Sequence, residues 1–400
     1  MSELTLPKQA LFNPYDWSFH ENPFPVYEQL REHYPVYYNE ELNFYALSRY
    51  DDVVQAFKNW PVYSNSAGVA LENVSDDVSK VFSILGMDPP RQQAVRGIVR
   101  KVFTPRRIIE LEPVLQRLCQ EYIADFADNG EVDFIEQFAG KIPMDVISEM
   151  IGVPKQDRDR VRNWANNLIE RVDGSPDIPD IAIEASIGLL GYFGAMVAER
   201  RQAGTSDDLT AQMLAAQLDG ERLSDEEVVS FLFLMSVAGN ETTTKLLANA
   251  LYWGQKHPEQ FAKVQEDHAN IPRWIEETTR YDNSSQILYR ITMEEVTLHG
   301  VTIPKGVKVA LLVGAANRDP RRFEQPDIYD IDRDLSQNVA FGKGVHFCLG
   351  AALARLEGRV CMEELFKVYK GFQVDEASLV RVHSGNVRGF SQMQVRFDRK

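Results

Sequence analysis

The sequence predicts a mainly α protein that folds as one unit, with small β-sheets at its periphery. From about Arg91 to Lys256 the residue pattern is almost wholly helical, and a second helical stretch runs from Leu349 to about Tyr369. Short segments typical of strands occur only outside these stretches. Because no proline- or glycine-rich linker divides the chain, we expect a single domain over residues 1–400.

Two groups of short strands are expected, one near each end of the chain. Each is rich in β-branched and aromatic residues, and together they cover Pro35–Asn39, Asn43–Ser48, Val296–Ile303, Val307–Val313 and a strand pair across Val387–Phe397. The clearest helix start is Ser224-Asp225-Glu226-Glu227, a capping box in which Ser224 and Glu227 satisfy orphan backbone donors. The helical pattern that follows runs to about Lys256, so this helix is expected to cross the core.

The composition is that of a globular protein with a large core. Hydrophobic residues make up 44% of the 400 residues and charged residues 26%, both ordinary values. The 59 aspartates and glutamates exceed the 43 lysines and arginines, which leaves a net charge of −16. A surface that acidic disfavours nucleic acid and anionic membranes as the main partner.

The cysteine content and the amino terminus point to a reducing compartment. Cys119, Cys348 and Cys361 include no closely spaced pair, which excludes a disulfide framework, a cysteine-rich zinc site and an iron–sulfur cluster. The first residues lack the apolar run of a signal peptide. No apolar stretch approaches the roughly 20 residues of a membrane-spanning helix. We therefore expect a soluble, cytoplasmic protein.

The strongest local signal is the decapeptide Phe-Gly-Lys-Gly-Val-His-Phe-Cys-Leu-Gly from Phe341 to Gly350. Its three glycines allow a tight loop, and Cys348 directly precedes a helical segment. A thiolate at a helix start is stabilised by the helix dipole and by unpaired N–H groups, which suits a metal ligand. Cys119 and Cys361 lack this context and are interpreted as buried structural cysteines.

This decapeptide resembles the haem-ligand loop of the cytochrome P450 family, and further motifs in the family's order extend the resemblance over nearly the whole chain. The resemblance implies the cytochrome P450 fold, a large helical bundle around a haem. It also implies that the cofactor is haem b, that the Cys348 thiolate is the axial ligand of its iron, and that Phe341, His346 and Gly350 bind the cofactor.

A second motif, Ala238-Gly239-Asn240-Glu241-Thr242-Thr243, lies inside the long helix. Gly239 costs about 1 kcal/mol relative to alanine in a helix, and Thr242 can donate to the carbonyl of Ala238 and bend the helix. From these residues alone, a tolerated kink and a functional site are equally supported. By resemblance the motif is the oxygen-binding groove, where Glu241 and Thr242 form the catalytic acid–alcohol pair that supplies protons during dioxygen activation, and Ala238 contacts the cofactor.

A third motif, Glu277-Thr278-Thr279-Arg280, places Glu277 and Arg280 at i, i+3. Such a pair on a helix surface is worth only a few tenths of a kcal/mol, so the spacing alone indicates a solvated face. The resemblance instead implies a buried structural lock, completed by Arg333.

The haem propionates need cationic or hydrogen-bonding partners. By resemblance these partners are Arg96, Arg290 and His346. The family commonly has a histidine four residues before the first of them, where this chain has Gln92. A glutamine amide can donate to a propionate but supplies no charge.

The resemblance implies a haem-thiolate monooxygenase that hydroxylates a small, mostly apolar and neutral organic substrate. Its substrate pocket would include Leu85, Met235, Ala238, Leu288 and Phe390. Two alternatives stay open: a haem-thiolate peroxygenase that uses hydrogen peroxide, and a non-enzymatic haem-binding sensor. The Glu241-Thr242 pair argues against both.

Electrons would come from an acidic ferredoxin and its NAD(P)H-dependent reductase, with the protein as a monomer. The net negative charge of the chain opposes a complex with an acidic protein. Salt screens charge interactions beyond about 8 Å, however, so the charges at the contact surface determine whether the two proteins associate. Arg96 is expected to point inward to a propionate, and seven further cations are expected to form a docking patch near Cys348: Arg100, Lys101, Arg106, Arg107, Lys343, Arg355 and Arg359.

Overall fold

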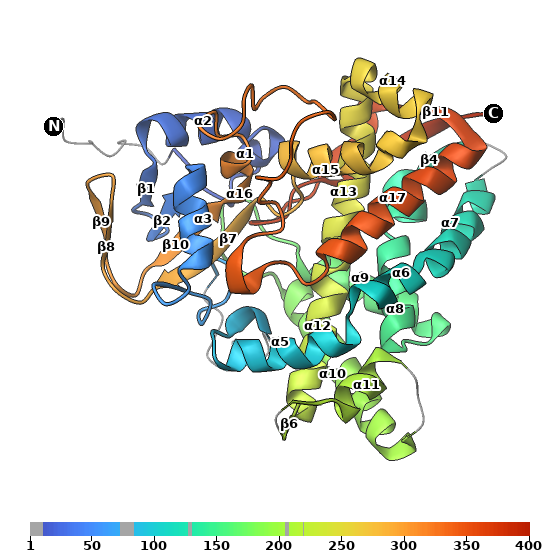
Figure 1. Cartoon of the computed structure of the whole chain (residues 1–400), viewed down its shortest axis with the longest axis horizontal. Helices are drawn as coiled ribbons and strands as arrows, with labels where there is room; N and C mark the ends of the chain where they lie inside the picture. The colour runs from blue at the N-terminus through green and yellow to red at the C-terminus, as the bar shows by residue number, and fades with distance from the viewer. Residues whose placement is uncertain (1–10, 73–83, 127–129, 205–207, 219) are drawn as a thin grey trace.

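The computed structural model describes residues 11–72, 84–126, 130–204, 208–218 and 220–400. A sheet-rich part lies at one end of its long axis and a larger helical part at the other (Figure 1). The helices of the amino-terminal part are α1 (Trp17–Glu21), α2 (Phe24–His33) and α3 (Tyr50–Lys58). The part therefore mixes helices with strands, as predicted.

Strands from both ends of the chain form one five-stranded sheet. Its order is β1-β2-β10-β7-β3, with bounds β1 (Val36–Asn39), β2 (Phe44–Leu47), β3 (Tyr63–Ser64), β7 (Ile287–Thr292) and β10 (Lys308–Leu312). Strand β10 pairs in parallel with β2 and antiparallel with β7. This pairing fixes the segment after residue 286 against the amino-terminal part of the chain.

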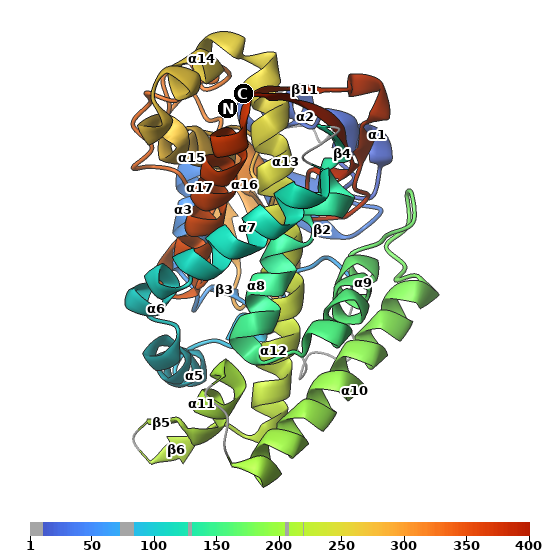
Figure 2. The same ribbon diagram turned by 90° about the vertical axis from the view of Figure 1, so that its right-hand side faces the viewer.

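The helical part holds the largest buried apolar cluster. Its helices are α5 (Arg91–Val102), α6 (Pro105–Glu110), α7 (Glu112–Phe126), α8 (Ile142–Ile151), α9 (Arg158–Leu168), α10 (Asp180–Ala203), α11 (Leu209–Ala215), α12 (Asp225–Ala238), α13 (Asn240–Lys256), α14 (Pro258–Glu266), α15 (Ile271–Tyr281), α16 (Val313–Ala316) and α17 (Ala351–Val368). Helices α12 and α13 follow one another through the centre, behind α7 and α8 (Figure 2).

The predicted capping box is present at the start of α12. Ser224 accepts from the backbone of Glu227, whose side chain accepts from the backbone of Ser224. The single helix expected up to Lys256 is instead divided at Gly239. A Cβ there would lie 2.3 Å from Cδ1 of Ile147 on α8, so a larger residue at this position would force the Ile147 side chain to move.

The remaining strands form small sheets at the periphery. They are β4 (Glu131–Asp133), β11 (Tyr369–Val374) and β14 (Gln394–Arg399) in one sheet, and the pairs β5 (Gln217–Leu218) with β6 (Glu221–Arg222), β8 (Val296–Leu298) with β9 (Val301–Ile303), and β12 (Val380–Arg381) with β13 (Phe390–Gln392).

Two strand predictions need correction. The strand expected at Val296–Ile303 is a hairpin, because His299 and Gly300 both adopt positive φ, 51° and 80°, and reverse the chain. The strands across Val387–Phe397 do not pair with each other: β13 pairs with β12, and β14 with β11 and β4. A local pattern predicts strands, whereas the choice of partner depends on the tertiary fold.

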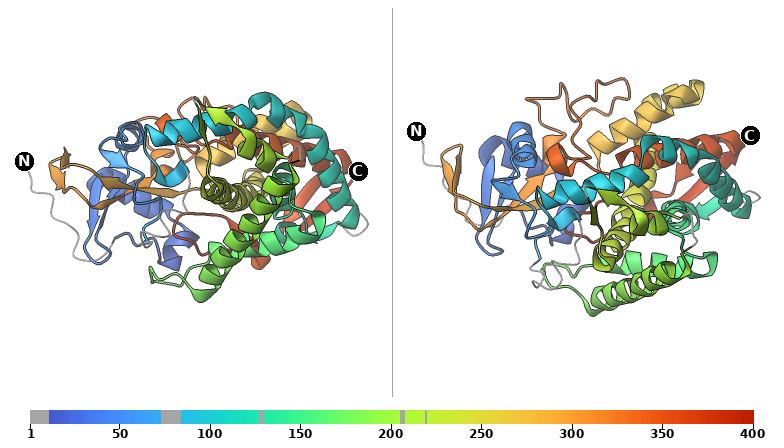
Figure 3. Two further views of the ribbon diagram at one scale, coloured as in Figure 1. Left: turned by 90° about the horizontal axis from the view of Figure 1, so that it is seen from below. Right: turned by 60° about the horizontal axis from the view of Figure 1, so that its bottom comes forward.

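Helix α10 lies along the outside of the helical part (Figure 3). Among the described helices, α10 alone is long and apolar enough to cross a membrane. Of its most apolar 18-residue segment, 33% is buried inside the protein.

Candidate active site

The loop that carries Cys348 is closed by its own backbone. The Cys348 N–H donates to the carbonyl of Phe341 at 2.9 Å. Gly342 and Gly344 adopt φ of 69° and 74°, and a Cβ on Gly344 would lie 2.7 Å from the carbonyl oxygen of Phe57 at the end of α3. The glycine spacing noted in the sequence therefore serves a tight turn packed against another helix.

Helix α17 begins three residues after Cys348, as the sequence predicted. Cys348 is an exposed residue. The many protein atoms around its thiol nevertheless desolvate it and raise its pKa. The N–H groups of Gly350 and Ala351, together with Arg96 and Arg355, act in the opposite direction and lower it. Because these groups favour the thiolate, the position suits a sulfur ligand to a metal cation.

Two buried side chains near this loop lack a hydrogen-bonded anion. Arg290 is 4% exposed, and burial lowers its pKa to about 10, while distant Asp88 raises it. The described residues place no carboxylate within ion-pair distance of Arg290. Among the described residues, the buried Nε2 of His346 has no hydrogen-bond partner, and Oδ1 of Asp88 lies 3.7 Å away, within ion-pair distance. Both groups fit the carboxylates of a bound ligand, as haem propionates would require.

Gln92 and Arg96 lie on α5 and contact the backbone of the cysteine loop. The Gln92 amide donates to the carbonyl of Val345 at 2.9 Å, and its buried Oε1 has no partner among the described residues. Arg96 donates to the carbonyl of Phe347 at 2.6 Å. Burial and then Arg100 lower the pKa of Arg96, whereas Cys348 raises it.

The predicted acid and alcohol follow the break between α12 and α13. Thr242 is partly exposed, and its hydroxyl donates to the carbonyl of Ala238 at 2.7 Å, the back-bond that the sequence suggested. Ala238 is exposed. Glu241, by contrast, is buried and pairs with Lys245, with Oε2 and Nζ 2.9 Å apart. Sequence reasoning missed Lys245, although the i, i+4 spacing signals a pair.

The Glu277–Arg280 pair is fully buried, so the solvated-face reading is wrong. Nε of Arg280 donates to Oε2 at 2.8 Å and Nη2 donates to Oε1 at 2.7 Å, and neither side chain is exposed. Nε of Arg333 lies 3.6 Å from Glu277 Oε1. The Arg333 guanidinium also donates to backbone carbonyls of residues 324–328, so these three residues join α15 to the segment that follows α16.

The predicted pocket residues have different surroundings. Leu85, Met235 and Leu288 are partly exposed, whereas Phe390 is 1% exposed. The ring of Phe390 packs 5.1 Å from that of Tyr252 on α13. Residues 73–83, which precede the predicted pocket residue Leu85, lie outside the described ranges.

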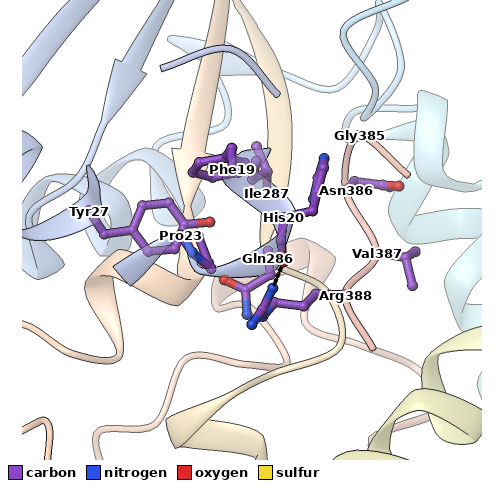
Figure 4. A pocket seen from close by; sticks show the side chains of 10 residues that line it. All are labelled: Phe19, His20, Pro23, Tyr27, Gln286, Ile287, Gly385, Asn386, Val387 and Arg388. Carbon is purple, nitrogen blue, oxygen red and sulfur yellow. Dashed lines mark hydrogen bonds between the residues drawn. The ribbon is translucent and has the colours of Figure 1, made fainter. Parts of the chain in front are cut away.

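A separate small cavity lies between α1, α2 and the turn at residues 385–388 (Figure 4). Arg388 at its edge pairs with buried Asp282 at 2.8 Å. Nε2 of His20 donates to the carbonyl of Pro14 at 2.8 Å, and burial lowers the pKa of His20 to about 4 despite this bond. The cavity contains none of the predicted site residues.

Comparisons with known proteins identify the family of the chain. The sequence profile described as cytochrome P450 matches residues 185–384. Cytochrome P450 123 of Mycobacterium tuberculosis is 49% identical over 97% of both chains. A vitamin D(3) 25-hydroxylase of Pseudonocardia autotrophica is 37% identical over 94% of both.

The fold comparison gives the same result. The structure of cytochrome P450 CYP109Q5 from Chondromyces apiculatus superimposes with a TM-score of 0.89 at 33% identity, over 97% of this chain and 98% of that one. The predicted fold, a large helical bundle with small peripheral sheets, is therefore confirmed. The chain belongs to the cytochrome P450 family and is a cytochrome P450 monooxygenase.

Proposed function

We propose that the chain binds haem b through the Cys348 thiolate and hydroxylates a small, mostly apolar organic substrate with dioxygen and electrons from a ferredoxin system. The observation that carries this proposal is the position of Cys348, in a loop closed by its N–H bond to the Phe341 carbonyl and three residues before the start of α17. When bound, the haem supplies the oxidising chemistry at a substrate C–H bond.

The residues of this chain would each have a limited role. Cys348 would bind the iron, and Arg290 and His346 would bind the propionates, because both are buried donors without a hydrogen-bonded anion. Arg96 and Gln92 would hold the cysteine loop through its carbonyls. Phe341, Gly350 and Ala238 would contact the cofactor, as the family motif implies.

Thr242 and Glu241 would handle protons. The Thr242 hydroxyl donates to Ala238 and keeps lone pairs that can accept a hydrogen bond from a proton donor in the groove. Glu241 supplies the ionisable group beside it. This pair supports monooxygenation with dioxygen over a peroxide-driven reaction, which needs no such proton supply.

A neutral substrate is supported by the charges near α9. An anionic substrate would need a cation, and the arginines of residues 158–171 are candidates for that role. All four form ion pairs with carboxylates: Arg158 with Glu149, Arg160 with Asp157, Arg162 with Asp159 and Arg171 with Glu72. The name of the vitamin D(3) hydroxylase agrees with a mostly apolar, neutral substrate class. A carboxylic acid that binds more tightly than its methyl ester would contradict this assignment.

The ferredoxin patch is smaller than the sequence suggests. Arg355 pairs with Glu276, Arg359 with Glu112 and Glu363, and Arg106 with Glu110, while Arg107 contacts Gln212. Among the side chains that the structure describes, no carboxylate pairs with Arg100, Lys343 or neighbouring Lys58. We propose that these three cations receive an acidic ferredoxin.

Charge reversal tests the patch. Arg100→Glu with Lys343→Glu should slow reduction by ferredoxin at low salt and flatten its salt dependence, because rim charges mainly set association rates. Reduction by dithionite should be unchanged. Equal ferredoxin rates for the double variant and the wild type at low ionic strength would exclude this docking surface.

We also propose one domain over residues 1–400, a monomer and a cytoplasmic location. The pairing of β10 with β2 supports one domain, since it joins distant parts of the chain. The net charge of −16 favours a dissolved monomer through mutual repulsion.

The decisive experiment replaces Cys348, the proposed ligand of the haem iron. Cys348→Ser and Cys348→His should lose the red-shifted ferrous–CO Soret band that thiolate ligation gives, and an unchanged band in Cys348→Ser would refute the assignment. NADH-dependent turnover with a surrogate ferredoxin system, compared with peroxide alone, separates the monooxygenase from a peroxygenase. Absence of turnover in both would indicate a haem-binding sensor.

A further inference from the structure

The two cysteines outside the Cys348 loop lie against each other in the core. Sγ of Cys119 on α7 and Sγ of Cys361 on α17 are 3.7 Å apart, and both side chains are 0% exposed. Both thiols are free in this structure. The two residues are 242 positions apart in the sequence, so their spacing gives no sign of this contact. The interpretation of each as a separate structural cysteine therefore omits their pairing.

Hydrogen bonds on either side of the thiols fix the two helices in this register. At the start of α7, Oε2 of Glu112 accepts from Nη2 of Arg359 at 2.6 Å. One residue after Cys119, Nε2 of Gln120 donates to Oε2 of Glu364 at 3.0 Å. Because these bonds join α7 to α17 before and after the cysteines, the sulfur contact follows from the packing of the helices.

A disulfide at this position needs only a small movement. Two sulfur atoms 3.7 Å apart are in van der Waals contact, which leaves no room for another atom between them. Bond formation brings the sulfurs to about 2.05 Å. Rotation of the two cysteine side chains supplies this approach, whereas the hydrogen bonds between α7 and α17 hold the backbones in place.

The surroundings of the pair keep it reduced under ordinary conditions. Burial, the hydrogen bond and charge of Cys119, and the charges of Glu357 and Glu364 all raise the pKa of Cys361. Because the thiolate is the reactive form of cysteine, oxidation of this pair is expected to be slow. In the cytoplasmic location proposed above, disulfides are transient and typical of redox sensing.

We propose that Cys119 and Cys361 form a reversible redox site, at which hydrogen peroxide converts the two thiols to a disulfide that joins α7 to α17. One sulfur attacks the peroxide, whose O–O bond breaks, and this gives a sulfenic acid and one water. The second sulfur attacks the sulfenic sulfur, forms the S–S bond and releases the second water. The two thiols together lose two electrons and two protons, which reduce one peroxide to two waters.

The position of this disulfide gives it a stabilising effect. Helix α17 begins three residues after Cys348, so the bond would tie the helix that follows the proposed haem ligand to α7. A cross-link between residues 242 positions apart strongly restricts the unfolded chain. Oxidation should therefore stabilise the fold while peroxide is present, and a dithiol should reverse the effect. The inference does not depend on the proposed substrate or electron donor.

Peptide mapping of the holoenzyme tests the bond itself. The protein is exposed to hydrogen peroxide in native buffer, the peroxide is removed with catalase, and free thiols are alkylated in denaturant before digestion without reduction. The expected product is a linked peptide pair that contains Cys119 and Cys361 and disappears after dithiothreitol. Cys119→Ala should lose this product. Alkylation of both cysteines in the treated wild type, or conversion of either to a sulfinic acid without a linked peptide, would overturn the proposal.

Thermal unfolding, followed by circular dichroism, tests the effect on stability. Peroxide treatment should raise the midpoint of the wild type by about 2–5 °C, and dithiothreitol should reverse the rise. Cys119→Ala and Cys361→Ala are compared before and after the same treatment, so that any cavity they create is present in both measurements. Neither variant should gain stability. A treated wild type that contains the disulfide but unfolds no later than its reduced form would refute the stabilising effect.

Discussion

Glu357, on α17 two and a half turns after Cys348, should make the stability of this protein depend on pH. The side chain is 1% exposed. Burial raises its pKa from 4.5 to about 8, although a hydrogen bond with Thr243 on α13 acts to lower it. Its Oε1 has no partner within the described residues. At neutral pH we therefore expect a protonated, uncharged carboxyl group between α17 and α13.

The sign of the effect follows from the two pKa values. Between pH 4.5 and about 8 the folded chain keeps this proton while the unfolded chain releases it. The free energy of unfolding must therefore fall as the pH rises through that window. Each pH unit corresponds to about 1.36 kcal/mol, so the total loss is about 5 kcal/mol at most.

The measurement is chemical denaturation of the wild type and of Glu357→Gln from pH 5 to pH 9, followed by circular dichroism. A glutamine stays neutral and can still accept from Thr243, so the variant should lose the decline and exceed the wild type in stability above pH 8. Glu363→Gln is the control, because Glu363 lies on the same helix but is 29% exposed beside Arg359. The same pH slope in wild type and Glu357→Gln would refute the reasoning.

Three further substitutions test the groove and the lock. Thr242→Ala should divert reducing equivalents to hydrogen peroxide while haem binding persists, because the hydroxyl is lost; peroxide and product yields per NADH measure this. Gly239→Ala should destabilise the protein by about 1–3 kcal/mol, since its Cβ would meet Cδ1 of Ile147 at 2.3 Å; a denaturation midpoint equal to that of the wild type would contradict it. Glu277→Gln leaves the Arg280 charge buried without a counter-charge and should cost about 3–5 kcal/mol in denaturation.

Local sequence signals predicted the helix starts correctly, but they did not predict which side-chain pairs are buried. The capping box at Ser224 and the helix start after Cys348 depend on a few adjacent residues, and both are present. Spacing does not reveal burial: Glu241 and Lys245 share the i, i+4 relation of Arg106 and Glu110, yet the first pair is buried and the second is exposed. Only tertiary packing decides between these outcomes.

The pairing of strands far apart in the chain could not be predicted from local sequence either. The parallel register of β10 with β2 joins residues more than 250 positions apart, for example Ala310 with Ala46. Each strand alone shows only an apolar segment, and no local feature states its partner. Asn166 belongs to the same class, because its contact with Glu241 exists only once α9 lies beside α13.

Two buried basic groups, Arg290 and His346, have no anion in hydrogen-bond contact among the described residues, which suits the proposed haem cofactor. Burying Arg290 without an anion is unfavourable, as its lowered pKa reflects. The unsatisfied Nε2 of His346 adds a second cost of the same kind. A ligand that supplies carboxylates to both groups would bind the folded state alone and so stabilise it by mass action. If Arg290 and His346 bind the haem propionates as proposed, haem affinity and folding stability should change together in variants of Arg290.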